Sequence, residues 1–383
     1  MAFVHCGSEE CTKSELDLFQ IAPTQTSSEK SIYIEVPPLL AITESAPIDF
    51  FIAGNGIDYM DLNNTLLYLC CKVVKGDGTE LAMDTEVGLV NYPMASIFSQ
   101  LDVMLGDHLI SQSNNCYPYR SFIESVLNYS NDTLATQFSA GLFYKETAGQ
   151  HEETELDGGN LGAAEGFKLR IVSASLFVKK VRGVAPGVRL GHVEALLTAN
   201  AKYPVDRVGM KMFSIPAGSR VSNHENLFLG QLPKMLVLGF VDNYAFSGSY
   251  AKNPFHFKHY DINFVALYVD GEQIPTKPLQ PDFEAGRCMR EYMNLVQTAG
   301  KHMKDRSLLI DREEFAQGYT LFAFDLFPNQ ECADHYSLIK TRNLRAEIRF
   351  GKALTVTVNM IVYGVFDNVI EINQKRNVLF DYM

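Results

Sequence analysis

The sequence predicts an all-β protein with a few helices on loops, built from two tandem β-domains. Runs rich in β-branched and aromatic residues recur along the chain and end at Gly, Asp or Asn turns. An order of strand, tight hairpin, spacer and helix occurs twice. The 383 residues are 46% hydrophobic, with 25 Phe and 18 Tyr, which is enough material for two separate cores.

The clearer of the two repeated units begins with strand-like sequence at Ile262–Tyr268. Asp270 and Gly271 follow it, and this dipeptide readily takes positive φ at both turn centres. The pair predicts a tight hairpin over Val269–Ile274. A Pro-rich spacer then leads to Phe283–Thr298, where apolar side chains recur at helical spacing.

The earlier unit has the same order of elements. Ser96–Ser111 offers a strand, a turn at Gly106 and Asp107, and a return strand. A spacer leads to Tyr117–Tyr129, whose apolar residues lie in helical register. Weak identity with a matched order of elements suggests two copies of one β-domain. The alternative is that any two hairpin-plus-helix units look alike.

Ahead of the first hairpin, loops separate several strand-like runs. Residues 1–30 are polar and carry no sustained period, so we predict an extended N-terminal arm. Further on, Gly54 and Gly56 favour a sharp reversal. The Asp and Asn residues after them lack the spacing of an EF-hand, which favours a connection between sheets over a calcium loop. The strand-like runs in this part are 32–36, 47–54 and 65–75.

The middle of the chain joins the two predicted domains. A short helical run is expected at Thr133–Phe143, and residues 150–167, acidic and then Gly-rich, are typical of an exposed loop. Lys168–Val181 has apolar groups on both faces, which predicts a central strand. Leu190–Tyr203 is a helix by pattern. The predicted domains are therefore 31–189, a linking helix at 190–203, and 204–383.

The two copies differ in their number of strands. After its helix, the second copy has strand groups at 319–326, 344–350 and 354–369, whereas the first has only Lys168–Val181. Either the first domain is smaller, or strands are missing around residues 155–166. A β-domain that lacks strands exposes unpaired edges and part of its core.

Composition excludes several classes of function. The formal charge of −12 opposes binding to phosphate backbones, so direct sequence-specific nucleic-acid binding is not expected. No apolar run is long enough to cross a bilayer, and the N-terminus lacks a secretory pattern. The seven cysteines form no CxxC or paired zinc spacing, which indicates reduced thiols of an intracellular protein.

The residue patterns of catalysis and metal binding are also missing from the sequence. A Pro-Ala-Gly turn at 216–218 invites comparison with cupins, but no His-x-His pair occurs. His256 and His259 are three apart, so on a strand they would face opposite ways. The acidic run 311–314 fits solvated surface better than a general acid and base. We therefore predict no enzyme, with no catalytic, cofactor-binding or metal-ligating residue. The residues singled out are structural turns: Gly54, Gly56, Gly106, Asp107, Asp270 and Gly271.

Several stretches together resemble double jelly-roll, hexon-like major capsid proteins. The resemblance is to those of Polinton (Maverick) elements and adomaviruses, and to uncharacterised capsid-like proteins in animal genomes. It covers nearly the whole chain from about Ser31. The stretches that carry it are GNGIDYMDLNNTLLYL, NNCYPYRSFIESVLNY, LGQLPKMLVLGFVDNYAFSG, NPFHFKHY and AEIRFGKALTVTVNMIVYGVFDNVIEI.

The resemblance implies two tandem jelly rolls and a structural function. Three chains would form a pseudo-hexagonal homotrimeric capsomer, and capsomers would tile an icosahedral shell, with penton or minor capsid proteins as further partners. The family implies no cofactor and no catalytic residue. The protein would be found in the virion, and inside the host cell. The alternative is a host-domesticated, capsid-derived binding protein that does not assemble into a shell. One departure is that family members usually carry further strands near residues 155–166.

Overall fold

The computed structural model describes residues 21–379, with gaps. The gaps are 22–23, 26–27, 45, 57, 83–84, 86–87, 112–113, 153–165, 183–185, 250, 328–335 and 337, and the side chains of 186–190 are also left out. Most of the predicted N-terminal arm, and nearly all of the 155–166 region where strands were thought to be missing, therefore lie outside the described residues.

The chain divides into two compact units. Unit 1 consists of Met1–Cys70 with Ile171–Leu197, and unit 2 of Cys71–Arg170 with Thr198–Met383. Two of the boundaries fall inside long strands, β2 (Tyr59–Lys75) and β5 (Phe167–Arg182), and the third falls at the end of a helix, between Leu197 and Thr198.

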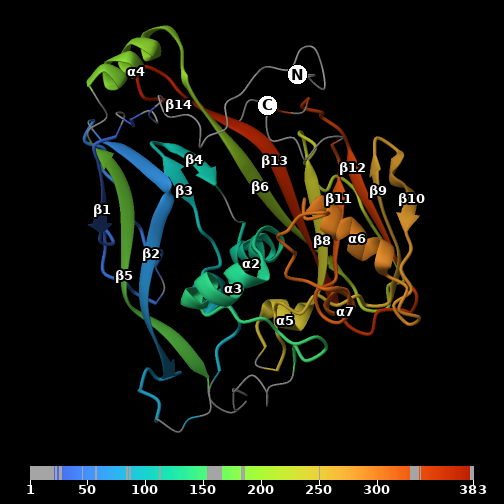
Figure 1. Cartoon of the computed structure of the whole chain (residues 1–383). Helices are drawn as coiled ribbons and strands as arrows, with labels where there is room; N and C mark the ends of the chain where they lie inside the picture. Colours follow the sequence, from blue (N-terminus) through green and yellow to red (C-terminus); the bar gives the residue numbers. More distant parts are fainter. Residues whose placement is uncertain are drawn as a thin grey trace, which may run out of the picture. The chain divides into compact units, whose positions relative to one another are not determined.

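Unit 1 is built on a three-stranded sheet in the order β1-β5-β2 (Figure 1). β1 (Lys30–Val36) runs antiparallel to β5. β5 lies in the middle, which confirms the prediction of a central strand. Only three described side chains of this unit are buried, namely Ala174, Val178 and Lys180, all on β5.

The linking helix of the sequence prediction is displaced in the structure. α4 spans Pro186–Thr198, and Ala201–Tyr203 already belong to the next strand. Pro186 opens the helix, because its fixed φ suits the first helical position. The predicted end at Tyr203 was wrong because residues 201–215 pair along their whole length with a later strand, and this ladder outweighs the local helical pattern.

Unit 2 contains a complete pair of antiparallel sheets. One has the order β10-β9-β12-β7, and the other contains β11-β8-β13-β14, with β6 also paired to β13. The strands are β6 (Ala201–Ile215), β7 (Val221–His224), β8 (Met235–Asp242), β9 (Ile262–Val269), β10 (Glu272–Leu279), β11 (Leu321–Asp325), β12 (Leu344–Phe350), β13 (Val358–Ile372) and β14 (Val378–Leu379).

The β8–β13 sheet buries both of its faces, because successive side chains of a strand point to opposite sides. Leu238 and Phe322 face the sheet that contains β9 and β12, and pack with Val265 into one core. Val237 and Ile361 face the other way, into a second core formed with helices. The sheet is therefore the middle of three layers.

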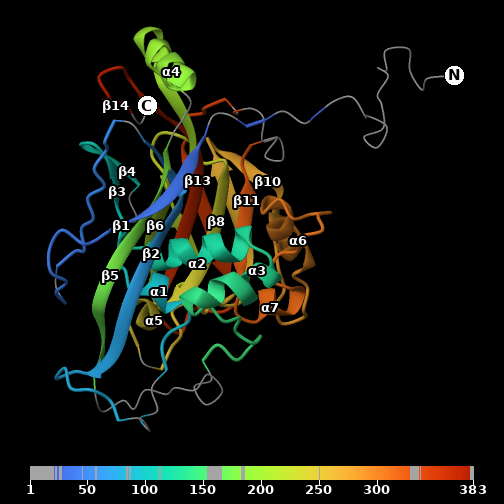
Figure 2. The same ribbon diagram turned by 60° about the vertical axis from the view of Figure 1, so that its left-hand side comes forward.

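The third layer consists of the helices that follow the two repeated hairpins, and all of these helices belong to unit 2. Figure 2 shows α2 and α3 lying across β8 and β13. Each repeated hairpin, β3–β4 or β9–β10, is followed by a helix, α2 or α6. The remaining elements of unit 2 are α1 (Pro93–Ser96), β3 (Val103–Leu105), β4 (His108–Ser111), α2 (Tyr117–Asn128), α3 (Asn131–Thr136), η2 (Gln137–Gly141), α5 (Asn243–Ser247), α6 (Met289–Thr298) and α7 (Arg312–Ala316).

The two repeated helices begin in the same way. Cys116 occupies the N-cap position of α2, with φ −118° and ψ 20°, and Cys288 occupies that of α6, with φ −129° and ψ 18°. Both thiols are buried and free, and burial raises the pKa of each. Equivalent backbone geometry at equivalent positions supports the internal repeat, although α6 starts six residues later than the predicted start at Phe283.

Candidate functional site

The predicted turn residues lie mainly at the tips of the two hairpins. Asp270 and Gly271 have φ of 49° and 89°, which is the pattern of a type I′ turn. In the other hairpin Gly106 alone takes positive φ, 60°, as in a type II′ turn, and Asp107 does not. Gly56 has φ 72° and lies in a loop of unit 1.

Gly54 does not need the conformational freedom of glycine. Its φ lies outside the positive region, and a Cβ added there would meet nothing within 4 Å. The reversal is held instead by the neighbouring Asn55, whose side chain accepts a hydrogen bond from the Asp58 amide at 2.9 Å.

An aromatic cluster joins α2 to the connector between α5 and β9, residues 248–261. The rings of Phe122 and Phe255 stack with centroids 4.4 Å apart and planes 3° apart. Phe257 packs beside them and also against β8, where an added Cβ on Gly239 would lie 2.6 Å from its ring. This connector contains the NPFHFKHY stretch of the sequence resemblance, and its Phe side chains are fully buried.

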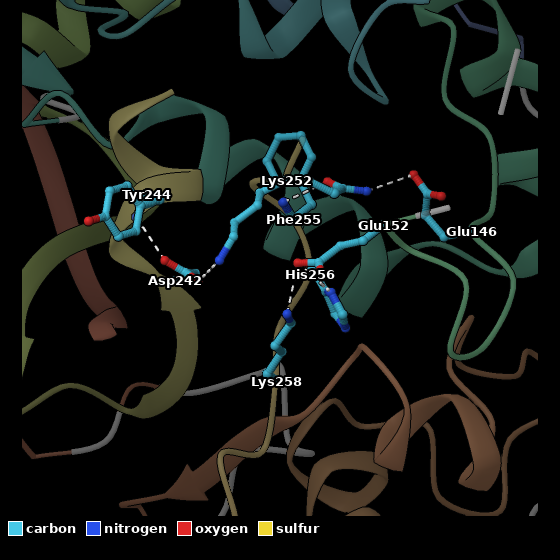
Figure 3. Close-up of polar contacts among 9 residues, drawn as sticks. Glu146, Glu152, Asp242, Tyr244, Lys252, Phe255, His256 and Lys258 are labelled. Carbon is cyan, nitrogen blue, oxygen red and sulfur yellow. Dashed lines mark hydrogen bonds and ion pairs between the residues drawn. The ribbon is translucent and has the colours of Figure 1, made fainter. Parts of the chain in front are cut away.

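Polar contacts fasten the same connector to its surroundings (Figure 3). The ammonium group of Lys252 pairs with Asp242, a buried carboxylate that also accepts the Tyr244 amide at the start of α5. Asn253 donates to Glu146 at 3.1 Å, and Lys258 donates to Glu152 at 2.8 Å. Both acidic residues belong to the segment Phe143–Glu152, which is thereby tied to the connector.

A histidine pair lies at the centre of this arrangement. His151 is 2% exposed, and its ring stacks on that of His256 with centroids 4.7 Å apart. The rings of His151 and Tyr319 pack in a T-shaped arrangement, with their centroids 4.9 Å apart. Gly318 leaves room for the His151 ring, because a Cβ added at residue 318 would lie 2.1 Å from that ring.

The ionisation of this cluster is perturbed by burial and by neighbouring charges. Desolvation, followed by the nearby His256, lowers the pKa of His151 to about 4. The pKa of Glu152 is lowered to about 2, because His256 and Lys258 both approach its carboxylate. The Nδ1 atom of His256 lies 3.4 Å from Glu152 Oε1 but is not aligned as a hydrogen bond, so Lys258 is the firmer partner.

The cluster borders a pocket of about 400 Å³ lined in part by His256, Lys258 and His259. The ring of His259 stacks on Phe283 and its Nδ1 accepts the Asp261 amide, so it does not join a ligand set with His256. Within the described residues no three His, Cys, Asp or Glu side chains converge in a way that could hold a metal ion.

Sequence reasoning missed the burial of His151 and the pairing of Glu152. His151 and Glu152 were expected in an exposed loop, but the first is buried and the second is paired. The expectation for the acidic run 311–314 was also wrong in part, because Glu314 is 8% exposed and pairs with Lys145 at 2.7 Å. A His beside an acidic residue gives no periodic signal, so only tertiary contacts could identify it.

Unit 1 presents a different kind of surface. Most large apolar side chains of β2 are exposed, and Leu66 and Tyr68 are 59% and 60% exposed, whereas on β1 only Tyr33 is exposed and the other apolar side chains are half-buried. In the described residues no helix is both long enough and apolar enough to cross a membrane. The other large apolar side chains exposed on the three strands are Tyr33, Tyr59, Met60, Leu62, Leu67 and Val172.

Comparison with known sequences gives one distant relative. No family model matches the chain. An uncharacterized protein of Caenorhabditis elegans is 22% identical over 417 residues, which cover 94% of this chain and 99% of the worm protein. Because 417 exceeds the 383 residues of this chain, the aligned part of the worm protein includes segments without a counterpart here.

Comparison with solved structures shows the fold. A chain of the Sputnik virophage matches with a TM-score of 0.65 and 11% identity, over 99% of this chain and 94% of that one. The Faustovirus major capsid protein matches with a TM-score of 0.56 and 7% identity, over 92% of each chain. The mavirus major capsid protein matches with a TM-score of 0.51 and 9% identity, over 100% of this chain and 97% of that one. The chain has the double jelly-roll fold of these capsid proteins, which confirms the fold expected from the sequence.

Proposed function

We propose that this chain is a structural capsid subunit, which forms pseudo-hexagonal homotrimers and, from them, an icosahedral shell. The observation that carries the proposal is the fold match along 92% to 100% of the chain to virophage and large-virus capsid proteins. The protein would act through association surfaces rather than through catalysis. Its place would be the virion capsid, and the host cell before assembly, with penton or minor capsid proteins as further partners.

The exposed sheet of unit 1 supports a function in association. Contiguous apolar surface on a soluble chain commonly marks an interaction site. β2, at the edge of its sheet, carries Leu62, Leu66 and Tyr68, all at least half exposed. Burial against other chains would remove this surface from water, as stable interfaces do.

We further propose that residues 31–189 belong to the first jelly roll and residues 204–383 to the second, with the first incomplete around 155–166. α4 lies at the junction, and β6 extends the second jelly roll back to Ala201. The longer aligned region of the worm protein supports a shortened chain. The test is to insert the extra worm segments and measure subunit assembly, which we expect to rise if the shortened domain is defective.

The function is tested by measuring the mass of the purified protein by light scattering after size exclusion, followed by electron microscopy. A trimer with a hexagonal outline, or a closed shell, is the expected result. A stable monomer at all concentrations would overturn shell assembly. It would favour the alternative of a capsid-derived binding protein kept by a host, which then needs a partner assay.

A further inference from the structure

The buried position of His151 is unusual for a group that gains a proton near neutral pH. Neither ring nitrogen has a hydrogen-bond partner among the described protein atoms, although the side chain is 2% exposed. Buried polar groups are normally hydrogen-bonded, so an exception calls for an explanation. The ring lies between His256 and Tyr319, which gives packing contacts but no acceptor suited to a second proton.

The surroundings of His151 oppose a positive charge more than they favour one. His256 and Lys258 face it from the connector, and Glu152, the nearest acid, already accepts from Lys258 at 2.8 Å. His259 lies on the same connector. The other charged or titratable groups are Tyr144, Lys145 and Glu146 on the segment, Tyr260 on the connector, Glu314 on α7 and Tyr319 after it. Of these, Lys145 and Glu314 already form an ion pair.

We propose that the stacked pair His151–His256 is a pH-sensitive latch, which holds the segment Phe143–Glu152 against the connector and releases it on acidification. Two neutral rings can stack at 4.7 Å, but two imidazolium rings at that distance repel each other. Glu152 lies 3.4 Å from His256, whereas a protonated His151 is left buried with no hydrogen-bond acceptor among the described residues.

The direction of the pH effect follows from the proton balance. In the released segment His151 titrates near its ordinary pKa of about 6.5, whereas in the closed form its pKa is lowered to about 4. The released form therefore binds more protons between these values, and the closed form loses stability as pH falls through 6.5 towards 4. The opening equilibrium should rise about 30-fold between pH 7.5 and pH 5.

The latch does not depend on the proposed function, because every group in it belongs to unit 2 of one chain. Two backbone amides of the segment report on its release, and a third reports on its internal turn. The Glu146 amide donates to the Tyr319 hydroxyl at 3.2 Å, that of Gly149 to the Gln317 carbonyl at 2.8 Å, and that of Gln150 to Thr147. The ladder between β8 and β11 provides an internal reference, since it contains no part of the latch.

Hydrogen exchange of the full chain at pH 7.5 and pH 5, corrected for intrinsic exchange rates, tests the latch. In the wild type we expect protection of the Glu146 and Gly149 amides to fall about 30-fold at pH 5, with the β8–β11 ladder unchanged. His151→Phe keeps a stacked ring that cannot titrate, and should remove the pH response. A pH-independent wild type would overturn the latch.

Two further variants keep the test decisive. His108→Gln changes an exposed histidine of the β3–β4 hairpin, and should leave the pH response of the segment intact. Should His151→Phe fail to fold at pH 7.5, as judged by circular dichroism, His151→Gln removes the same titration with a smaller side chain. A 30-fold response that survives in either folded His151 variant would assign it to another group and overturn the proposal.

Discussion

The two β-regions of this chain have strands of similar length but bury very different amounts of them. β13, in unit 2, has nine consecutive buried residues from Val358 to Phe366. β2 has one, Val74, which lies beyond Cys70, so the part of β2 that belongs to unit 1 has none. The difference lies in whether both faces of the sheet are covered by another layer. β13 belongs to a sheet covered on both faces within its own unit, while the sheet of β1, β5 and β2 has no such cover among the described residues of unit 1. Apolar strands alone do not make a core.

The largest expected effect comes from removing a core ring in unit 2. Phe322 on β11 is fully buried and packs edge-on to Phe240, so Phe322→Ala should lower the free energy of unfolding by about 3–5 kcal/mol. Urea denaturation followed by circular dichroism measures this loss.

Leu66→Ala on β2 is the matched change in unit 1. The substitution should lower the free energy of unfolding by less than about 0.5 kcal/mol, because the Leu66 side chain is already 59% exposed. That figure applies to the single chain. A larger loss that depends on protein concentration would place the sheet in an interface between subunits, as the proposed assembly requires, whereas a larger loss at every concentration would contradict the exposure of Leu66.

The next effect tests how tightly each region is packed around a glycine. Gly239→Ala would put a Cβ 2.6 Å from the ring of Phe257 and 3.0 Å from Leu321, and overpacking of this kind costs about 1–3 kcal/mol. Gly54→Ala in unit 1 meets open space, and should be neutral or slightly stabilising. Thermal unfolding of both variants checks the contrast, and equal shifts in Tm would refute it.

The smallest effect concerns helix ends. Asp311 accepts the amides of Glu313 and Glu314 in a capping box at α7, so Asp311→Ala should cost about 1 kcal/mol. Ser130 precedes α3 without a side-chain cap, and Ser130→Ala should cost less. The urea midpoints of the two variants measure the difference, and a larger loss at Ser130 would contradict the capping geometry.

The sequence predicted those parts of the fold that depend on local pattern. The turn at Asp270 and Gly271, the central position of β5 and the amphipathic α2 all follow from residue type and period. The sequence could not predict which surfaces meet. α4 ends early because residues 201–215 pair with β13, and His151 is buried because distant residues 256 and 319 enclose it. Contacts between segments far apart leave no periodic trace.

The stacking of Phe122 on Phe255 has a consequence for how the protein is made. α2 leaves the ribosome well before the residues that bury it, since its ring partners extend to Tyr319. At roughly 5–20 residues per second, its apolar side would be exposed for on the order of ten to forty seconds of synthesis. Nascent chains paused before residue 255 should therefore need a chaperone to remain in solution, and full-length chains, which contain the remaining core strands, should not.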